Sequence, residues 1–174
     1  LGFYNRAFML VNLPIEYLSG SFSKVLFPAF SKIQQEEERL RSVYLSSISV
    51  VVYVILSIAL GMVAAADSIV LVLLGKGWEE AIPILRLLAI AAGINFLSHY
   101  GGIICEAKAR LKNKFILQLS YLILITVGLY LTREKGVVTM AGVLVVAQLI
   151  RHSGYLFVVK NILKIDQNSY TRAY

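Results

Sequence analysis

Residues 2–31, GFYNRAFMLVNLPIEYLSGSFSKVLFPAFS, decide the fold class, because this run is long and apolar enough to cross a bilayer and still contains three ionisable side chains. A spanning helix needs about 20 mostly apolar residues. An ionisable group inside one costs roughly 2.5 to 3.5 kcal/mol unless it faces water or a partner. Arg6, Glu16 and Lys24 therefore predict a helix over residues 3–30 that borders a polar cavity.

The composition independently indicates a polytopic, all-α membrane protein. The chain is 58% hydrophobic and 16% charged, where soluble domains have about 45 to 50% apolar and about 25% charged residues. The net charge of +7 comes from short Lys and Arg clusters between apolar runs, without a nucleic-acid-binding motif, so no nucleic acid partner is expected. Cys105, the single cysteine, excludes a disulfide framework and a cysteine zinc site. Because the chain starts at Leu1 and lacks a cleavable signal, we expect it to be a fragment.

The apolar runs predict a five-helix transmembrane bundle forming one domain over residues 1–174. The expected spans are residues 3–30, 43–66, 81–105, 115–131 and 137–159. Residues 68–78 are too short to cross, so we expect an interfacial segment there. Trp78 is either a headgroup anchor or a platform for sugar stacking. Residues 160–174 are polar and basic, and we expect a cytoplasmic tail.

The distribution of Lys and Arg predicts the orientation. One set of connectors holds Lys32, Arg39, Arg41, Lys108, Arg110, Lys112, Lys114, Lys160, Lys164 and Arg172. The opposite set holds Arg6, Lys76, Arg133 and Lys135. The more basic side is expected in the cytoplasm, because cytoplasmic loops carry an excess of Lys and Arg.

Two residues of the first span have alternative interpretations. Pro14 either only kinks the helix for packing or acts as a hinge. Glu16 is either a coupling site that binds and releases a proton or sodium ion, or one partner of a buried ion pair with Lys24 or Arg151. Further along, His99 has no metal-ligand partner at suitable spacing, which favours a hydrogen bond between helices over a metal site.

The sequence resembles one family of exporters over essentially its whole length. The matching motifs are LGFYNRAF at residues 1–8, LP at 13–14, VLFPAFS at 25–31, QQEEERLRSVY at 34–44, LLGKGW at 73–78, PILRL at 83–87 and the small residues of 138–143. These are similar to Wzx-type lipid-linked oligosaccharide flippases of the multidrug/oligosaccharidyl-lipid/polysaccharide (MOP) exporter superfamily. The sequence departs from the family pattern at Phe8 and at residues 106–108.

The resemblance implies a lipopolysaccharide or O-antigen type flippase of the bacterial inner membrane. Its substrate would be undecaprenyl-pyrophosphate-linked oligosaccharide, moved by alternating access between two lobes. The chain would form most of the C-terminal lobe, with membrane lipid, the missing N-terminal lobe and glycan polymerase machinery as partners. Arg6, Lys24 and Arg151 are the candidate substrate-binding cations, because Arg and Lys form charge-assisted hydrogen bonds with phosphate. Arg6 has the alternative of marking the outer interface.

No catalytic motif supports an enzyme, and no cofactor or metal is predicted. Two other function classes remain open. A drug or cation extruder of the same superfamily would need an acidic, aromatic cavity, for which only Glu16 qualifies. A non-transporting assembly subunit would pair its buried ionisable residues internally and leave no cavity.

Overall fold

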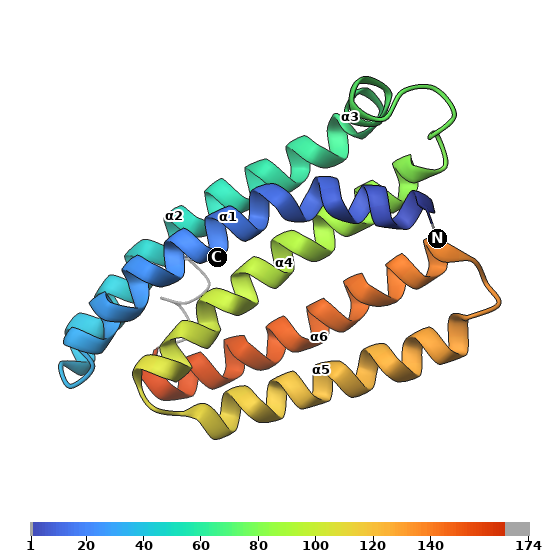
Figure 1. The fold of residues 1–174 in the computed structure, drawn as a ribbon. Coiled ribbons are helices and arrows are strands. Elements are labelled where there is room, and N and C mark those ends of the chain that lie inside the picture. Colours follow the sequence, from blue (N-terminus) through green and yellow to red (C-terminus); the bar gives the residue numbers. More distant parts are fainter. Residues whose placement is uncertain (1, 166–174) are drawn as a thin grey trace.

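The computed structural model describes residues 2–165, and over that range the chain is an all-α bundle without strands, as predicted. The helices are α1 (Gly2–Lys32), α2 (Glu37–Ala64), α3 (Ala66–Leu73), α4 (Ala81–Ala107), α5 (Leu111–Thr132) and α6 (Val137–Leu163). Figure 1 shows the long helices running alongside one another, with the short α3 turned away at the end of α2.

α4 is the central helix of the bundle. It packs against α1 and α2 on one side and α6 on the other, while α5 lies outermost, mainly against α6 (Figure 1). Of the 27 residues of α4, 18 are buried, whereas α5 has no buried residue. Small side chains make the close packing possible: a Cβ added to Gly93 would lie 3.1 Å from the Cβ of Ala59 in α2, and one on Gly101 would lie 3.3 Å from the Cβ of Tyr155 in α6.

Four helices, α2, α4, α5 and α6, are long and apolar enough to cross a membrane, one fewer than the five predicted spans. α1 is the exception, although it has 31 residues and packs along α4. Its polar residues lower its hydropathy below that of a typical span. The hydropathy of α1 therefore does not by itself identify a membrane span.

Several observed boundaries differ from the predicted ones. α2 begins at Glu37 instead of residue 43, because the charged run forms its first turns, where Arg39 pairs with Glu36 at 3.1 Å. α6 continues through Lys160 to Leu163, so part of the predicted tail is helical. The rest of that tail, residues 166–174, lies outside the described residues.

Most of the basic connectors meet at one end of the bundle. Lys108 Nζ donates to the carbonyl oxygen of Gln34 at 2.8 Å, and Lys164 Nζ pairs with Glu37 at 2.9 Å. These contacts join the α1–α2 turn, the α4–α5 turn and the end of α6. Arg172 lies outside the described residues.

The other end is held by different contacts. The rings of Phe3 and Trp78 meet edge-on at 5.3 Å, and Arg86 pairs with Asp67 at 2.6 Å. The grouping of connectors assumed by the charge count is therefore present in the fold.

We predict that the two ends of α4 face opposite sides of the membrane. In a cysteine-free background made with Cys105→Ala, Lys112→Cys and Lys76→Cys should react from opposite sides, Lys76→Cys with an impermeant thiol reagent added to intact cells. Lys76 is a suitable site because the next residue, Gly77, has a φ of +91° that a side chain would strain. Labelling of both positions from the same side would contradict the predicted topology.

Candidate functional site

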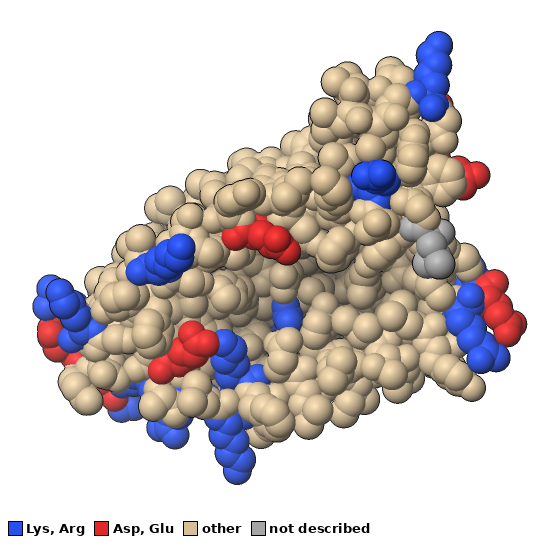
Figure 2. Space-filling view, viewed as in Figure 1, with Lys and Arg blue, Asp and Glu red and all other residues tan. Residues whose placement is uncertain are grey.

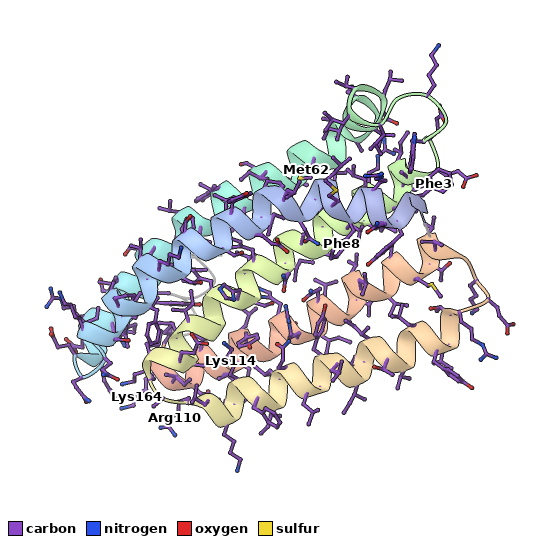
Figure 3. The ribbon with its side chains drawn as sticks, viewed as in Figure 1. Phe3, Phe8, Met62, Arg110, Lys114 and Lys164 are labelled. Carbon is purple, nitrogen blue, oxygen red and sulfur yellow. The ribbon has the colours of Figure 1, made fainter. Side chains whose placement is uncertain are left out.

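A cleft of about 420 Å³ lies between α1 and α4 on one side and α5 and α6 on the other. Figure 2 shows the corresponding face hollowed between α1 and α6, with a basic group in its depth. Its lining residues are Tyr4, Phe8, Val11, Asn12, Ile15, Glu16 and Ser19 of α1, Leu88, Ala91, Ala92 and Asn95 of α4, Gln118 and Tyr121 of α5, and Leu144, Gln148 and Arg151 of α6. Figure 3 shows Phe8 projecting from α1 into the same gap.

A second cavity of about 320 Å³ continues the cleft toward the basic end. The two cavities share Asn95, Gln118 and Arg151 in their walls. Beyond these residues the second cavity is lined by Ser98, His99, Gly102, Lys114 and Tyr155. Lys114, which Figure 3 labels at this end, pairs with Glu106. The two cavities therefore adjoin, and polar side chains from Glu16 to Lys114 line this path along the bundle.

Arg151 is the central residue of this path, and it is held by uncharged partners. Its side chain is only 7% exposed. Its guanidinium donates to Gln118 Oε1 at 3.3 Å and to Asn95 Oδ1, and it lies over the Tyr121 ring at 4.1 Å. A desolvated cation over an aromatic ring gains about 2 kcal/mol. Because these partners carry no negative charge, Arg151 keeps its positive charge facing the cleft.

The network around Arg151 is not fully satisfied. Gln148 Nε2 donates to the Tyr121 hydroxyl at 2.7 Å, which fixes one end of the amide. Gln148 Oε1 and Arg151 Nε are buried and have no hydrogen-bond partner within the described residues. An unpaired buried polar atom costs about 1 to 3 kcal/mol. A donor, Arg151 Nε, and an acceptor, Gln148 Oε1, therefore remain available about one helical turn apart on α6.

Glu16 lines the cleft from the opposite helix, α1, and its side chain is exposed. It forms no hydrogen bond or ion pair within residues 2–165. The ion pair with Lys24 or Arg151 that we considered is therefore not formed in the described structure, and the coupling role remains a prediction. The cleft thus has a carboxylate on one wall and a guanidinium on the other.

In the part of the chain that the structure describes, neither Arg6 nor Lys24 lines the cleft or the second cavity. They are 18 residues apart, which is five turns of an α-helix, so they lie on one face of α1. That face differs from the one that lines the cleft. α1 is continuous through Pro14, and the hinge role of Pro14 remains a prediction.

Sequence reasoning identified Arg151 but missed most of its neighbours. His99 does bond between helices, its Nε2 lying 2.7 Å from Ser23 Oγ of α1. Gln118, Tyr121 and Gln148 were not singled out. Their signal was the pairing of polar residues three positions apart in apolar helices, Gln118 with Tyr121 and Gln148 with Arg151, which places each pair on one helix face. No cluster of potential metal ligands occurs among residues 2–165.

We predict that removing the hydrogen bond between Asn95 and Arg151 lowers the stability of the folded protein. Asn95→Leu should lower the free energy of unfolding by about 1.5 to 3 kcal/mol, because the buried guanidinium loses a charged hydrogen bond. Asn12→Leu is the matched control, since Asn12 lines the same cleft without a hydrogen bond within the described residues. Chemical unfolding of the detergent-solubilised protein compares them. Equal stability of the two variants would contradict the network described here.

The amino-acid sequence of this chain is similar to those of several bacterial proteins. A family model described as polysaccharide biosynthesis protein matches residues 1–83. The teichuronic acid biosynthesis protein TuaB of Bacillus subtilis is 25% identical over 98% of this chain and 35% of its own length. The lipopolysaccharide biosynthesis protein WzxC of Escherichia coli is 32% identical over 66% of this chain and 23% of its own length. The succinoglycan biosynthesis transport protein ExoT of Rhizobium meliloti is 31% identical over 53% of this chain and 19% of its own length.

No solved structure gives a significant match. The chain spans about a third of TuaB and less of the other two relatives. The four apolar helices make it a multi-pass membrane protein, and the bacterial inner membrane fits these relatives. The resemblance seen in the sequence motifs is therefore confirmed: the chain is a homologue of the bacterial membrane proteins of polysaccharide biosynthesis and transport.

Proposed function

We propose that this chain forms part of a polysaccharide exporter of the flippase type, and that the cleft binds the polar head of a lipid-linked oligosaccharide during its transfer across the inner membrane. The observation that carries the proposal is the un-neutralised Arg151 in a cleft between helices long enough to span a bilayer. An ionisable residue inside a membrane bundle typically marks a transport pathway.

The cleft lining suits the three parts of such a substrate. Arg151 can bind a phosphate oxygen, because guanidinium donors match phosphate geometry. The amides of Asn95, Gln118 and Gln148 can exchange hydrogen bonds with sugar hydroxyls. The apolar residues on the α1 side of the cleft, Phe8, Val11 and Ile15, can contact the polyprenyl chain. Undecaprenyl pyrophosphate is the carrier that the family resemblance implies.

The proposal includes a second lobe that closes the cleft, since the relatives are much longer than this chain. Alternating access would expose the cleft first to one side of the membrane and then to the other. Arg6 and Lys24 would contact the substrate only if the rest of the protein extends around α1 to their face. Arg151 is therefore the principal substrate-binding cation of the proposal.

Two features argue against the alternative functions. A cation extruder should have a predominantly acidic cleft, whereas this one places Arg151 deeper than Glu16, with Arg151 buried and Glu16 exposed. An assembly subunit should pair its ionisable residues and leave no cavity, whereas Glu16 is unpaired within the described residues and a cleft is present.

The first functional prediction concerns Arg151. In the complete protein, Arg151→Met should lower polysaccharide export by roughly tenfold or more at normal membrane abundance, because a charged hydrogen bond to phosphate is worth about 1.5 to 3 kcal/mol. Arg86→Met is the matched control, since Arg86 pairs with Asp67 outside the cleft. Complementation of a strain that lacks the exporter measures both.

If Arg151→Met does not reach the membrane, Gln118→Leu replaces an exposed group that lines both cavities and should also reduce export. Normal export by a stable Arg151→Met variant, or by Gln118→Leu in its place, would contradict the proposal.

The second functional prediction concerns Glu16, which we propose couples transport to an ion gradient by binding and releasing a proton or sodium ion. Glu16→Gln should retain export but make it insensitive to collapse of that gradient. Glu38→Gln, an exposed carboxylate outside the cleft, should leave the gradient dependence unchanged. Transport assayed in vesicles with imposed gradients distinguishes the two. Gradient-dependent export by Glu16→Gln at the wild-type rate would rule out the coupling role.

A further inference from the structure

A groove of about 480 Å³ lies at the basic end of the bundle, separate from the cleft, with which it shares no lining residue. It is lined by Glu37 of α2, by Lys108, Arg110 and Asn113 at the α4–α5 turn, and by Phe157, Val158, Asn161, Ile162 and Lys164 along and just after α6. Figure 3 shows Arg110 and Lys164 at this same end.

The charge of the groove is strongly positive, because three cations face one carboxylate. Lys164 pairs with Glu37 at 2.9 Å, and Lys108 donates to a backbone carbonyl. The guanidinium of Arg110 has no hydrogen bond or ion pair within residues 2–165. Arg110 also directly precedes α5, whose first turn has no side-chain cap, and the free N–H groups of a helix start favour an anion. Two positive charges therefore remain uncompensated.

The turn that carries these cations is held in one conformation. Ala109 has a φ of +53°, in the left-handed region, and Arg110 N donates to the carbonyl oxygen of Cys105 at 2.7 Å. This is the arrangement in which a helix C-terminus closes on itself. Lys108 and Arg110 are thus positioned by the end of α4, so little ordering is needed when an anion binds.

The deeper part of the groove is apolar. Phe157, which is 67% exposed, lies with Val158 and Ile162 on α6. Phe157 precedes Lys164 by seven residues, so it lies about 10 Å further into the bundle. An exposed aromatic ring about 10 Å below a row of cations matches a molecule with an anionic head and an acyl chain beneath it.

We propose that this groove binds an anionic phospholipid with two phosphates, such as cardiolipin. Basic pockets between membrane helices are known to receive such headgroups. The two uncompensated charges match two phosphates, and the apolar floor distinguishes a lipid from a soluble phosphate. The site requires only that the bundle lies in a membrane and does not depend on the proposed transport activity.

The experiment measures lipid retention by the complete protein purified in detergent, with native mass spectrometry and a titration of its thermal unfolding. Cardiolipin should bind and raise Tm more than phosphatidylglycerol, and phosphatidylethanolamine should have no effect. Arg110→Gln/Lys164→Gln should weaken cardiolipin binding about 30-fold, because each cation near the surface contributes roughly a factor of five. Phe157→Ser should also weaken it.

Lys112→Gln/Lys135→Gln is the matched control, because it removes the same charge from exposed positions outside the groove and should retain binding. If the double variant is unstable, Arg110→Gln alone serves, since the Arg110 side chain has no partner within the described residues to lose. Unchanged binding by the groove variants would overturn the proposal. Equal binding of phosphatidylglycerol would overturn the two-phosphate assignment, and competition by inorganic pyrophosphate with no effect of Phe157→Ser would show a phosphate site instead of a lipid site.

Discussion

The close approach of α4 to its neighbours is the constraint on which the rest of the structure depends. Between membrane helices, packing of small residues and interhelical hydrogen bonds replace the hydrophobic effect as the source of association. The contacts of Gly93 with Ala59 and of Gly101 with Tyr155 leave little room for a side chain at either glycine. Because α1 and α6 both pack on α4, the position of α4 determines how far apart the two walls of the cleft lie.

Within that frame, Arg151 is retained in the interior without being neutralised. A carboxylate partner would offset the cost of burial but would also cancel the charge. Asn95, Gln118 and the Tyr121 ring stabilise the guanidinium through oriented dipoles and a π face, and none of them carries a negative charge. The remaining unpaired atoms, Arg151 Nε and Gln148 Oε1, show that this stabilisation is incomplete. Moving the Arg151 guanidinium toward a polar ligand therefore costs less free energy than it would if every polar atom of the network had a hydrogen-bond partner.

The sequence predicted the parts of the structure that depend on local composition. The charge-free run at residues 43–66 marked α2, and the basic clusters marked the connectors that meet at one end. The Arg151 network was harder to predict, because its members come from three helices, and only Arg151 is unusual for a span when taken alone. Gln118 is significant because it accepts from Arg151, and Gln148 because it donates to Tyr121, and both contacts depend on how α5 and α6 are rotated and not on composition. Hydropathy does not by itself identify α1 as a span, because this helix combines a buried face with polar residues on its other faces.

If α1 crosses the membrane as the sequence predicts, the positions of its ionisable groups along the helix axis would account for its polar composition. Arg6 and Lys24 are separated by about 27 Å along the helix axis, close to the roughly 30 Å thickness of the hydrocarbon core. Long cationic side chains at those two levels can extend to opposite headgroup layers at little cost. Glu16 lies about 15 Å from Arg6 and about 12 Å from Lys24 along the same axis, and its shorter side chain cannot reach either layer. It is also the residue of α1 with a formal charge that lines the cleft. If α1 crosses the membrane as the sequence predicts, the cleft gives a polar surrounding to the one charge of the helix that the bilayer would not tolerate, and this would link the unusual sequence of the helix to the opening of the bundle beside it.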